Sequence, residues 1–195
     1  NEPMLRLLHQ FQEATTFGSL IQPCLDEQNI TFARQAIEAK DLGGHLFLRE
    51  THAKVLSVLE QAEMLCQRYH IVVANPPYMG VKQMDKGIKE FAKEFYSSGR
   101  ADLFAMFIEL GFRLSKTSGF VAMVTMESWM FLTSYEGLRA NILNTKTILC
   151  LLHMPYSGKG GTSMGINFGT SAVIFLNSSV PLHEGHYSCI RYYET

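Results

Sequence analysis

Apolar positions along the chain follow two different periods, which separate expected helices from expected strands. Apolar residues that recur every three or four positions predict amphipathic helices. Such helices are expected over 3–15, 29–40, 51–69, 82–96, 102–116 and 133–144. Short runs rich in β-branched residues predict buried strands. Strands are expected over 71–74, 120–125, 147–153 and 170–176, with one more short strand within 186–195.

The order of these elements predicts an α/β fold. Strands that alternate with helices indicate a mainly parallel sheet with helices on both faces. The runs at 147–153 and 170–176 have no helix between them, so the final strand of this pair is expected to run antiparallel. We expect an N-terminal helical segment over 1–69, an α/β core over 70–180 and a tail over 181–195.

The composition, 47% hydrophobic and 18% charged with a net charge of −1, is that of a folded domain. So small a net charge excludes a global basic field, and any nucleic-acid contact has to be local. The four cysteines lie far apart and the seven histidines lack ligand spacing, which favours reduced thiols and no metal site. No apolar run is long enough for a membrane span. A start at Asn1, without an initiator Met or a signal peptide, predicts a segment of a longer cytoplasmic protein.

The run 71–74 ends in Asn75-Pro76-Pro77-Tyr78, which combines two rigid acceptors with a flat ring. An exocyclic amine on a heteroaromatic base is a poor nucleophile because the ring delocalises its lone pair. Two oxygens that accept both amino hydrogens free that lone pair. The Asn75 side chain offers one, and the Pro76 backbone, restricted by Pro77, offers the other. Tyr78 offers a face on which a base taken out of a duplex could stack. The alternative is an ordinary turn that ends a strand.

A strand followed by Asn-Pro-Pro-Tyr resembles the catalytic motif of amino methyltransferases. With the segments NPPYMG and DLFAMFIELGFRLSKTSGFVAMVTMESWMF, the chain resembles large N6-adenine DNA methyltransferases over 1–180. These include the type IIG restriction–modification enzymes and the methyltransferase of BREX phage-exclusion systems. The resemblance implies methyl transfer from S-adenosylmethionine to adenine N6 in double-stranded DNA. It also implies that 70–180 is the catalytic half of a Rossmann-like methyltransferase sheet.

The resemblance implies roles for residues beyond the motif. Four residues would line the pocket for the adenine of the cofactor: Asp102, Leu103, Phe107 and Pro77. Phe168, just before the run 170–176, would hold the extruded base opposite Tyr78. The alternatives are helix core for Phe107 and a loop anchor for Phe168.

The cofactor-binding signature of that family is missing. A glycine-rich turn after a first strand lets a ligand approach the backbone closely, and no such turn precedes Asn75. Gly43-Gly44 follows no expected strand, and the stretch 157–165 lacks the ending of a Walker loop, so a mobile loop is expected there. We therefore expect the isolated chain to bind S-adenosylmethionine weakly and to be inactive. Its expected partners are DNA and the missing cofactor-binding and target-recognition regions of a longer chain.

Four lysines follow the motif at helical spacing: Lys82, Lys86, Lys89 and Lys93. On one helical face they would form an edge that contacts DNA phosphates. The alternative is a solvated face with ion pairs inside the helix. Two other interpretations of the whole chain stay open. It could be a methyltransferase for protein glutamine or RNA guanine, or a non-catalytic nucleic-acid-binding fragment.

Overall fold

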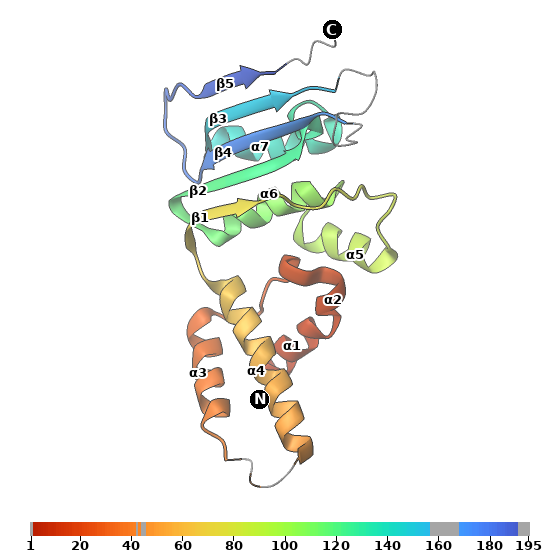
Figure 1. Cartoon of the computed structure of the whole chain (residues 1–195), viewed down its shortest axis with the longest axis vertical. Helices are drawn as coiled ribbons and strands as arrows, with labels where there is room; N and C mark the ends of the chain where they lie inside the picture. The colour runs from red at the N-terminus through yellow and green to blue at the C-terminus, as the bar shows by residue number, and fades with distance from the viewer. Residues whose placement is uncertain (1, 42, 44–45, 157–167, 191–195) are drawn as a thin grey trace. The chain divides into compact units, whose positions relative to one another are not determined.

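The computed structural model describes residues 2–41, 43, 46–156 and 168–190 (Figure 1). The chain divides into two compact units, unit 1 (Asn1–Gln67) and unit 2 (Arg68–Thr195). The glycine-rich stretch 157–165 and Gly44 lie outside the described residues, and the expectations about them stay predictions.

Unit 1 is helical. Its helices are α1 (Glu2–Gln10), α2 (Ala14–Phe17), α3 (Glu27–Glu38) and α4 (Leu46–Cys66), with 3-10 turns η1 (Phe11–Glu13) and η2 (Gly18–Leu20). The helix predicted over 3–15 is therefore interrupted by η1. Asp26 caps α3, because its carboxylate accepts the Asn29 N–H at 2.8 Å. Six buried apolar side chains of this unit form one cluster: Leu7, Phe11, Ile21, Ile30, Leu59 and Ala62.

Unit 2 is built on a sheet whose five described strands lie in the order β1-β2-β4-β3-β5. They are β1 (Tyr69–Ala74), β2 (Ser115–Met126), β3 (Thr147–Met154), β4 (Thr170–Leu176) and β5 (His186–Cys189). The predicted antiparallel pairing of β3 with β4 is confirmed. Four of the described strands run in one direction and β4 is reversed, so the sheet is mixed, with the mainly parallel arrangement that the sequence predicts. The reversed strand β4 lies between β2 and β3 and so forms two antiparallel pairs, while β1–β2 and β3–β5 are parallel.

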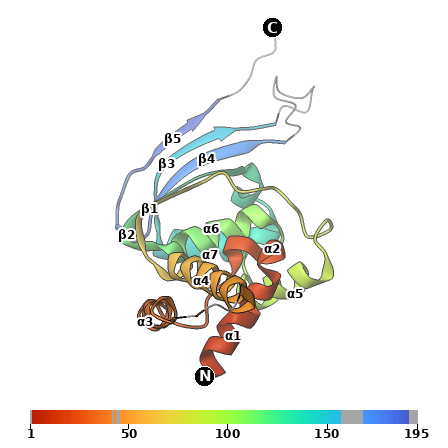
Figure 2. The ribbon, with the colours of Figure 1, turned by 60° about the horizontal axis from the view of Figure 1, so that its bottom comes forward.

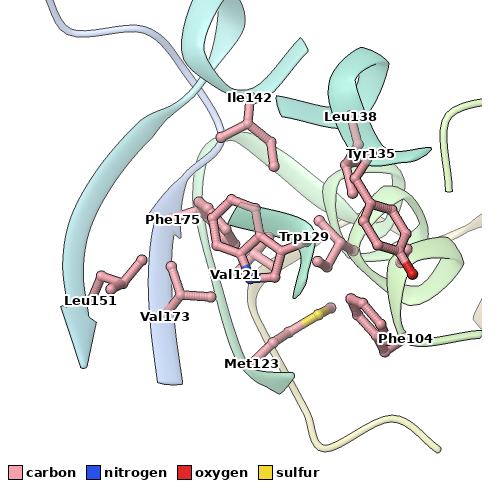
Figure 3. Close-up of a cluster of buried hydrophobic side chains, with 12 residues drawn as sticks. Phe104, Val121, Met123, Trp129, Tyr135, Leu138, Ile142, Leu151, Val173 and Phe175 are labelled. Atoms are coloured by element: carbon pink, nitrogen blue, oxygen red, sulfur yellow. The ribbon is translucent and has the colours of Figure 1, made fainter. Parts of the chain in front are cut away.

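The described helices of unit 2 are α5 (Lys86–Phe95), α6 (Leu103–Leu114) and α7 (Glu136–Thr145), with 3-10 turns η3 (Glu127–Met130) and η4 (Thr133–Tyr135). Figure 2 shows α6 and α7 on the same side of the sheet. Their apolar side chains meet alternate residues of β2, β3 and β4 in one core (Figure 3). Phe104, Ile108, Val121 and Phe175 are fully buried there. Burial of each such side chain contributes about 1.5–3 kcal/mol.

The other side of the sheet carries exposed apolar residues, which we call the open face: Ile71, Val73, Phe120, Val124 and Ile174. They alternate along their strands with the buried residues of the core, as successive side chains of a strand do. Val73 is 74% exposed. The helices of the described part of unit 2 that pack against the sheet, α6 and α7, leave the open face uncovered. The prediction of helices on both faces is therefore wrong for this part of the chain.

Candidate active site

The tetrapeptide Asn75-Pro76-Pro77-Tyr78 lies at the carboxyl edge of the sheet. It follows β1 directly, and the parallel pairing of Ala74 with Met123 sets this end of β1 beside the end of β2. The end of β3 and the start of β4 lie at the same edge, because Met126 and Met154 both pair with Thr170. Open α/β sheets bind ligands at this edge.

The residues that follow the tetrapeptide are tied to the start of α6. Asp102, only 6% exposed, accepts the N–H of Met79 at 3.0 Å and the N–H of Phe104 at 3.2 Å. The Leu103 N–H donates to the Met79 carbonyl at 3.1 Å. Burial raises the pKa of Asp102 above its ordinary value, and the backbone hydrogen bonds to its carboxylate partly oppose the rise. Asp102 caps α6, and the same carboxylate also holds the loop that carries the motif.

Asn75 lies at the surface, whereas Pro76 is buried. The Tyr78 hydroxyl lies 3.4 Å from Asn75 Oδ1 and 3.3 Å from the Val124 carbonyl oxygen, long hydrogen bonds to two acceptors. An amide oxygen has two lone pairs, so Asn75 Oδ1 can still accept a second hydrogen bond. No residue of the described part donates to the Pro76 carbonyl. Asn75 Oδ1 therefore keeps one lone pair for a further donor, and the Pro76 carbonyl has no donor among the described protein groups.

The Tyr78 ring lies against two phenylalanines. Its centroid is 6.1 Å from that of Phe104 and 5.2 Å from that of Phe168, both in edge-to-face geometry. The structure thus brings together Tyr78 and Phe168, the two rings predicted to hold a base, although they are far apart in the sequence. Burial raises the pKa of the Tyr78 phenol, and the charge of Asp102 raises it further. Tyr78 consequently stays a neutral hydrogen-bond donor at neutral pH.

The four residues predicted to line a cofactor pocket differ in exposure. Pro77 is exposed and Phe107 is half-buried, whereas Asp102 and Leu103 are buried. Among these four, Pro77 and Phe107 therefore present the side-chain surface that a bound molecule could contact. The Asp102 carboxylate already accepts two backbone hydrogen bonds.

The predicted lysine edge is shorter than expected. Asp85 caps α5 by accepting the Ile88 N–H at 2.8 Å, so the helix begins at Lys86 and not at 82. Lys82 lies in the preceding turn and does not share the helical face. Lys86 and Glu90 form an ion pair at 3.8 Å between side chains that are 89% and 65% exposed. Solvent screens such a pair, and it contributes little to stability.

Sequence reasoning missed a polar pair at the same edge. Glu127 directly follows β2, and its Oε2 lies 2.5 Å from Nε2 of His153 near the end of β3. The two side chains are 19% and 26% exposed. The available signal was an acidic residue two positions after the predicted strand 120–125. Its partner, on another strand, could not be identified from spacing.

Other features of the described residues do not compete with this site. No group of three or more His, Cys, Asp or Glu side chains there could hold a metal ion. None of the described helices is long and apolar enough to cross a bilayer. A hollow of about 470 Å³ lies in unit 1, lined by Glu2, Pro3, Arg6, Cys24 and Leu25. None of the predicted site residues lines it, and its two charged groups, Glu2 and Arg6, pair with each other.

The fold of the chain is similar to that of a solved restriction–modification enzyme. A nuclease-deletion mutant of the Type ISP enzyme LlaGI, solved in complex with a DNA substrate mimic, superimposes with a TM-score of 0.51. The match has 17% sequence identity and covers 71% of this chain and 16% of that one. A family model described as "Eco57I restriction-modification methylase" matches residues 14–159. The chain belongs to this family.

Two curated relatives are adenine-specific methyltransferases. The chain is 40% identical over 185 residues to BrxX of Escherichia coli O9:H4 (strain HS), which covers 94% of this chain and 15% of that protein. It is 31% identical over 152 residues to PglX of Lacticaseibacillus casei (strain Zhang), which covers 76% of this chain and 13% of that protein. The chain thus spans a small part of the length of the relatives it matches.

Proposed function

We propose that the chain is the catalytic part of a longer enzyme that methylates the N6 amino group of adenine in double-stranded DNA, with S-adenosylmethionine as methyl donor. The observation that carries the proposal is the surface position of Asn75 beside Tyr78 and Phe168 at the carboxyl edge of the sheet. The names of the relatives BrxX and PglX point to the same acceptor. The longer enzyme would belong to a restriction–modification or phage-defence system.

The chemistry needs two acceptors and no strong base. The adenine amine would donate one hydrogen to Asn75 Oδ1 and the other to the Pro76 carbonyl. These bonds draw N6 toward tetrahedral geometry, so that its lone pair can attack an electrophilic carbon. Bound S-adenosylmethionine would supply that carbon as a methyl group on sulfur, and the carbon–sulfur bond breaks as the nitrogen–carbon bond forms. The nitrogen then releases one proton to water. The acceptor pair stabilises the positive charge that develops on N6.

Entry of the base requires Phe168 to move. The Tyr78 and Phe168 rings meet edge to face, and their centroids are 5.2 Å apart. A base stacked between two rings needs about 3.5–4.0 Å on each side, which is about 7 Å between the ring planes. The Tyr78 hydroxyl is held by Asn75 and Val124, so Phe168 is the ring that turns away. Extruding a base costs a few kcal/mol, and stacking on a ring returns about 1–3 kcal/mol.

The cofactor would meet only part of its binding site on this chain. Pro77 and Phe107 would border its adenine, and the buried residues Asp102 and Leu103 would support this wall from behind. No glycine-rich turn that could hold the rest of the cofactor precedes Asn75 in this sequence. Another region of the longer protein would supply it. On this proposal the isolated chain binds the cofactor weakly and is inactive.

The open face supports a missing region of this kind. It is a contiguous set of apolar side chains on β1, β2 and β4, and β1 forms an edge of the described sheet. Contiguous exposed apolar patches mark surfaces that bind other protein segments. We assign the open face and the β1 edge to the cofactor-binding region of the longer protein. The lysines Lys82, Lys86, Lys89 and Lys93 would add contacts to DNA phosphates, and a target-recognition region would read the sequence.

The test is methyl transfer by the longer protein to three acceptors. Radiolabelled S-adenosylmethionine is incubated with the protein and duplex DNA, RNA or protein extract, and the labelled product is digested and identified. The proposal predicts label in DNA as N6-methyladenine. Label only in protein glutamine or RNA guanine would assign the same motif to a different acceptor and refute the proposal. Absence of both cofactor binding and transfer would indicate a non-catalytic fragment.

A further inference from the structure

The pair formed by Glu127 and His153 lies at the carboxyl edge but takes no part in the methyl transfer described above. Glu127 is the first residue after β2, and His153 is on β3, so the pair spans across β4. Their side chains are joined at 2.5 Å and are mostly buried. A charged or hydrogen-bonded contact of this kind holds two strand ends in one geometry.

Glu127 also holds the chain just before β4. Its backbone N–H donates to the Gly169 carbonyl at 2.9 Å. Gly169 is buried, and a Cβ at this position would overlap the Glu127 carboxylate. A side chain at position 169 would therefore displace the Glu127 carboxylate from its present position. The next residue toward the N-terminus is Phe168, the ring in contact with Tyr78.

His153 is fixed from the other side. It pairs with Ser171 in the β3–β4 ladder. The Ser171 hydroxyl bonds to the Thr125 hydroxyl at 3.1 Å and accepts the Trp129 indole N–H at 3.0 Å, and all three side chains are buried. The His153 imidazole consequently presents its Nε2 to Glu127 from a rigid part of the sheet. Its Nδ1 faces the Cys189 sulfur at 3.9 Å.

We propose that Glu127 and His153 form a positioning pair that fixes the backbone at Gly169 and so sets where Phe168 stands opposite Tyr78. This inference rests on the proposed function, because it assigns the pair a role in holding the extruded base. With Gly169 fixed, Phe168 admits a base by rotating its side chain, and it closes again at the same place. Without the pair, the backbone that carries Phe168 shifts and the base is stacked on one side only.

The experiment uses the longer protein and a duplex with 2-aminopurine in place of the target adenine, after the methylated sequence has been mapped with the wild-type protein. The fluorescence of 2-aminopurine rises when it leaves the duplex stack and is quenched when it stacks on an aromatic ring. The variants are Glu127→Ala, Glu127→Gln and Gly169→Ala. Glu184→Ala, at an exposed glutamate in the same unit, is the matched control. Because 2-aminopurine lacks the N6 amine, the KM for DNA and kcat are measured for each variant on the same duplex with adenine at the target position, together with cofactor affinity and thermal unfolding.

Loss of one stacking wall predicts that Glu127→Ala raises the KM for DNA by roughly 5–50-fold and brightens the 2-aminopurine signal. Cofactor affinity and kcat at saturating DNA should stay within about threefold. Glu127→Gln can still bond to His153 and should restore wild-type behaviour. Gly169→Ala displaces the Glu127 carboxylate. It should therefore raise the KM for DNA and the 2-aminopurine signal as Glu127→Ala does, and it provides this test even if Glu127→Ala folds poorly. Wild-type KM and fluorescence in both alanine variants would overturn the inference, as would a Glu127→Gln variant as impaired as Glu127→Ala. Failure of the proposed function is separate, since the wild-type protein would then not methylate DNA.

Discussion

Replacing Asp102 with alanine tests how the motif loop is held. The carboxylate caps α6 by accepting the Phe104 N–H, and it accepts the partly buried Met79 N–H next to Tyr78. Loss of a helix cap costs about 0.5–2 kcal/mol, and a buried N–H left without a partner costs about 1–3 kcal/mol. The free energy of unfolding should therefore fall by about 2–4 kcal/mol, the two contributions overlapping in part.

Asp102→Asn separates the hydrogen bonds from the charge. The amide oxygen can accept the same two N–H groups, so the variant should lie within about 1 kcal/mol of wild type at neutral pH. Burial raises the pKa of Asp102, so the folded state binds this proton more tightly than the unfolded state does. The stability that this proton contributes is fully present below the ordinary pKa of an aspartate and is lost as pH rises through the raised value. Relative to wild type, Asp102→Asn should gain stability over that window.

The assay is urea unfolding of the chain at several pH values, with Asp85→Ala as the matched control. Asp85 caps α5 through the Ile88 N–H but lies at the surface, so its loss should cost the cap alone, about 1 kcal/mol. A loss of less than about 0.5 kcal/mol for Asp102→Ala would contradict the magnitudes above. So would an Asp102→Asn variant as unstable as Asp102→Ala.

Three further outcomes are expected. Tyr78→Ala should weaken binding of an extruded base in the longer protein by about 1–3 kcal/mol, whereas Tyr78→Phe, which keeps the ring, should retain most of this affinity, measured with 2-aminopurine duplexes. Val73→Asp, on the open face, should leave unfolding of the isolated chain within about 0.5 kcal/mol but lower cofactor affinity of the longer protein, measured by calorimetry. Replacing Lys86 and Lys93 together with glutamine should reduce the salt dependence of DNA binding by about two phosphate contacts, a change in log–log slope of about 1.8.

Each of these outcomes has a result that would contradict it. Equal affinities for Tyr78→Ala and Tyr78→Phe would exclude stacking on this ring. Unchanged cofactor affinity in Val73→Asp would show that the open face does not contact a cofactor-binding region. An unchanged salt dependence of DNA binding in the lysine variant would show that these lysines face solvent and do not contact DNA phosphates.

The elements of unit 2 could be predicted from apolar runs, but their limits could not. The run 170–176 matches β4, whereas β2 begins at Ser115, five residues before the expected start. This early part of β2, from Ser115 to Ser118, is polar and has no apolar pattern, although Ser115 pairs with Tyr69 of β1. The expected start of α5 was too early because Asp85, which caps it, stands between two lysines of the apparent helical repeat.

The open face marks a limit of pattern reasoning. Strands such as 71–74 are apolar on both sides, which predicts two covering layers. The pattern does not say whether the same chain segment supplies both layers, and here the described helices supply one. The motif at the strand tip could be identified because it is contiguous. The contact of Phe168 with Tyr78 was inferred only through resemblance, and the Glu127–His153 pair depends on strand order that the sequence does not reveal.

The most direct test of the central claim is the rate of a single methyl-transfer turnover by the longer protein with Asn75 replaced by alanine. The variant loses one of the two acceptors for the adenine amine, and Asn75 lies at the surface, so folding should be retained. Removal of one transition-state hydrogen-bond partner predicts a rate about 10²–10³-fold lower, with affinities for DNA and cofactor little changed. A wild-type rate in Asn75→Ala would contradict the account.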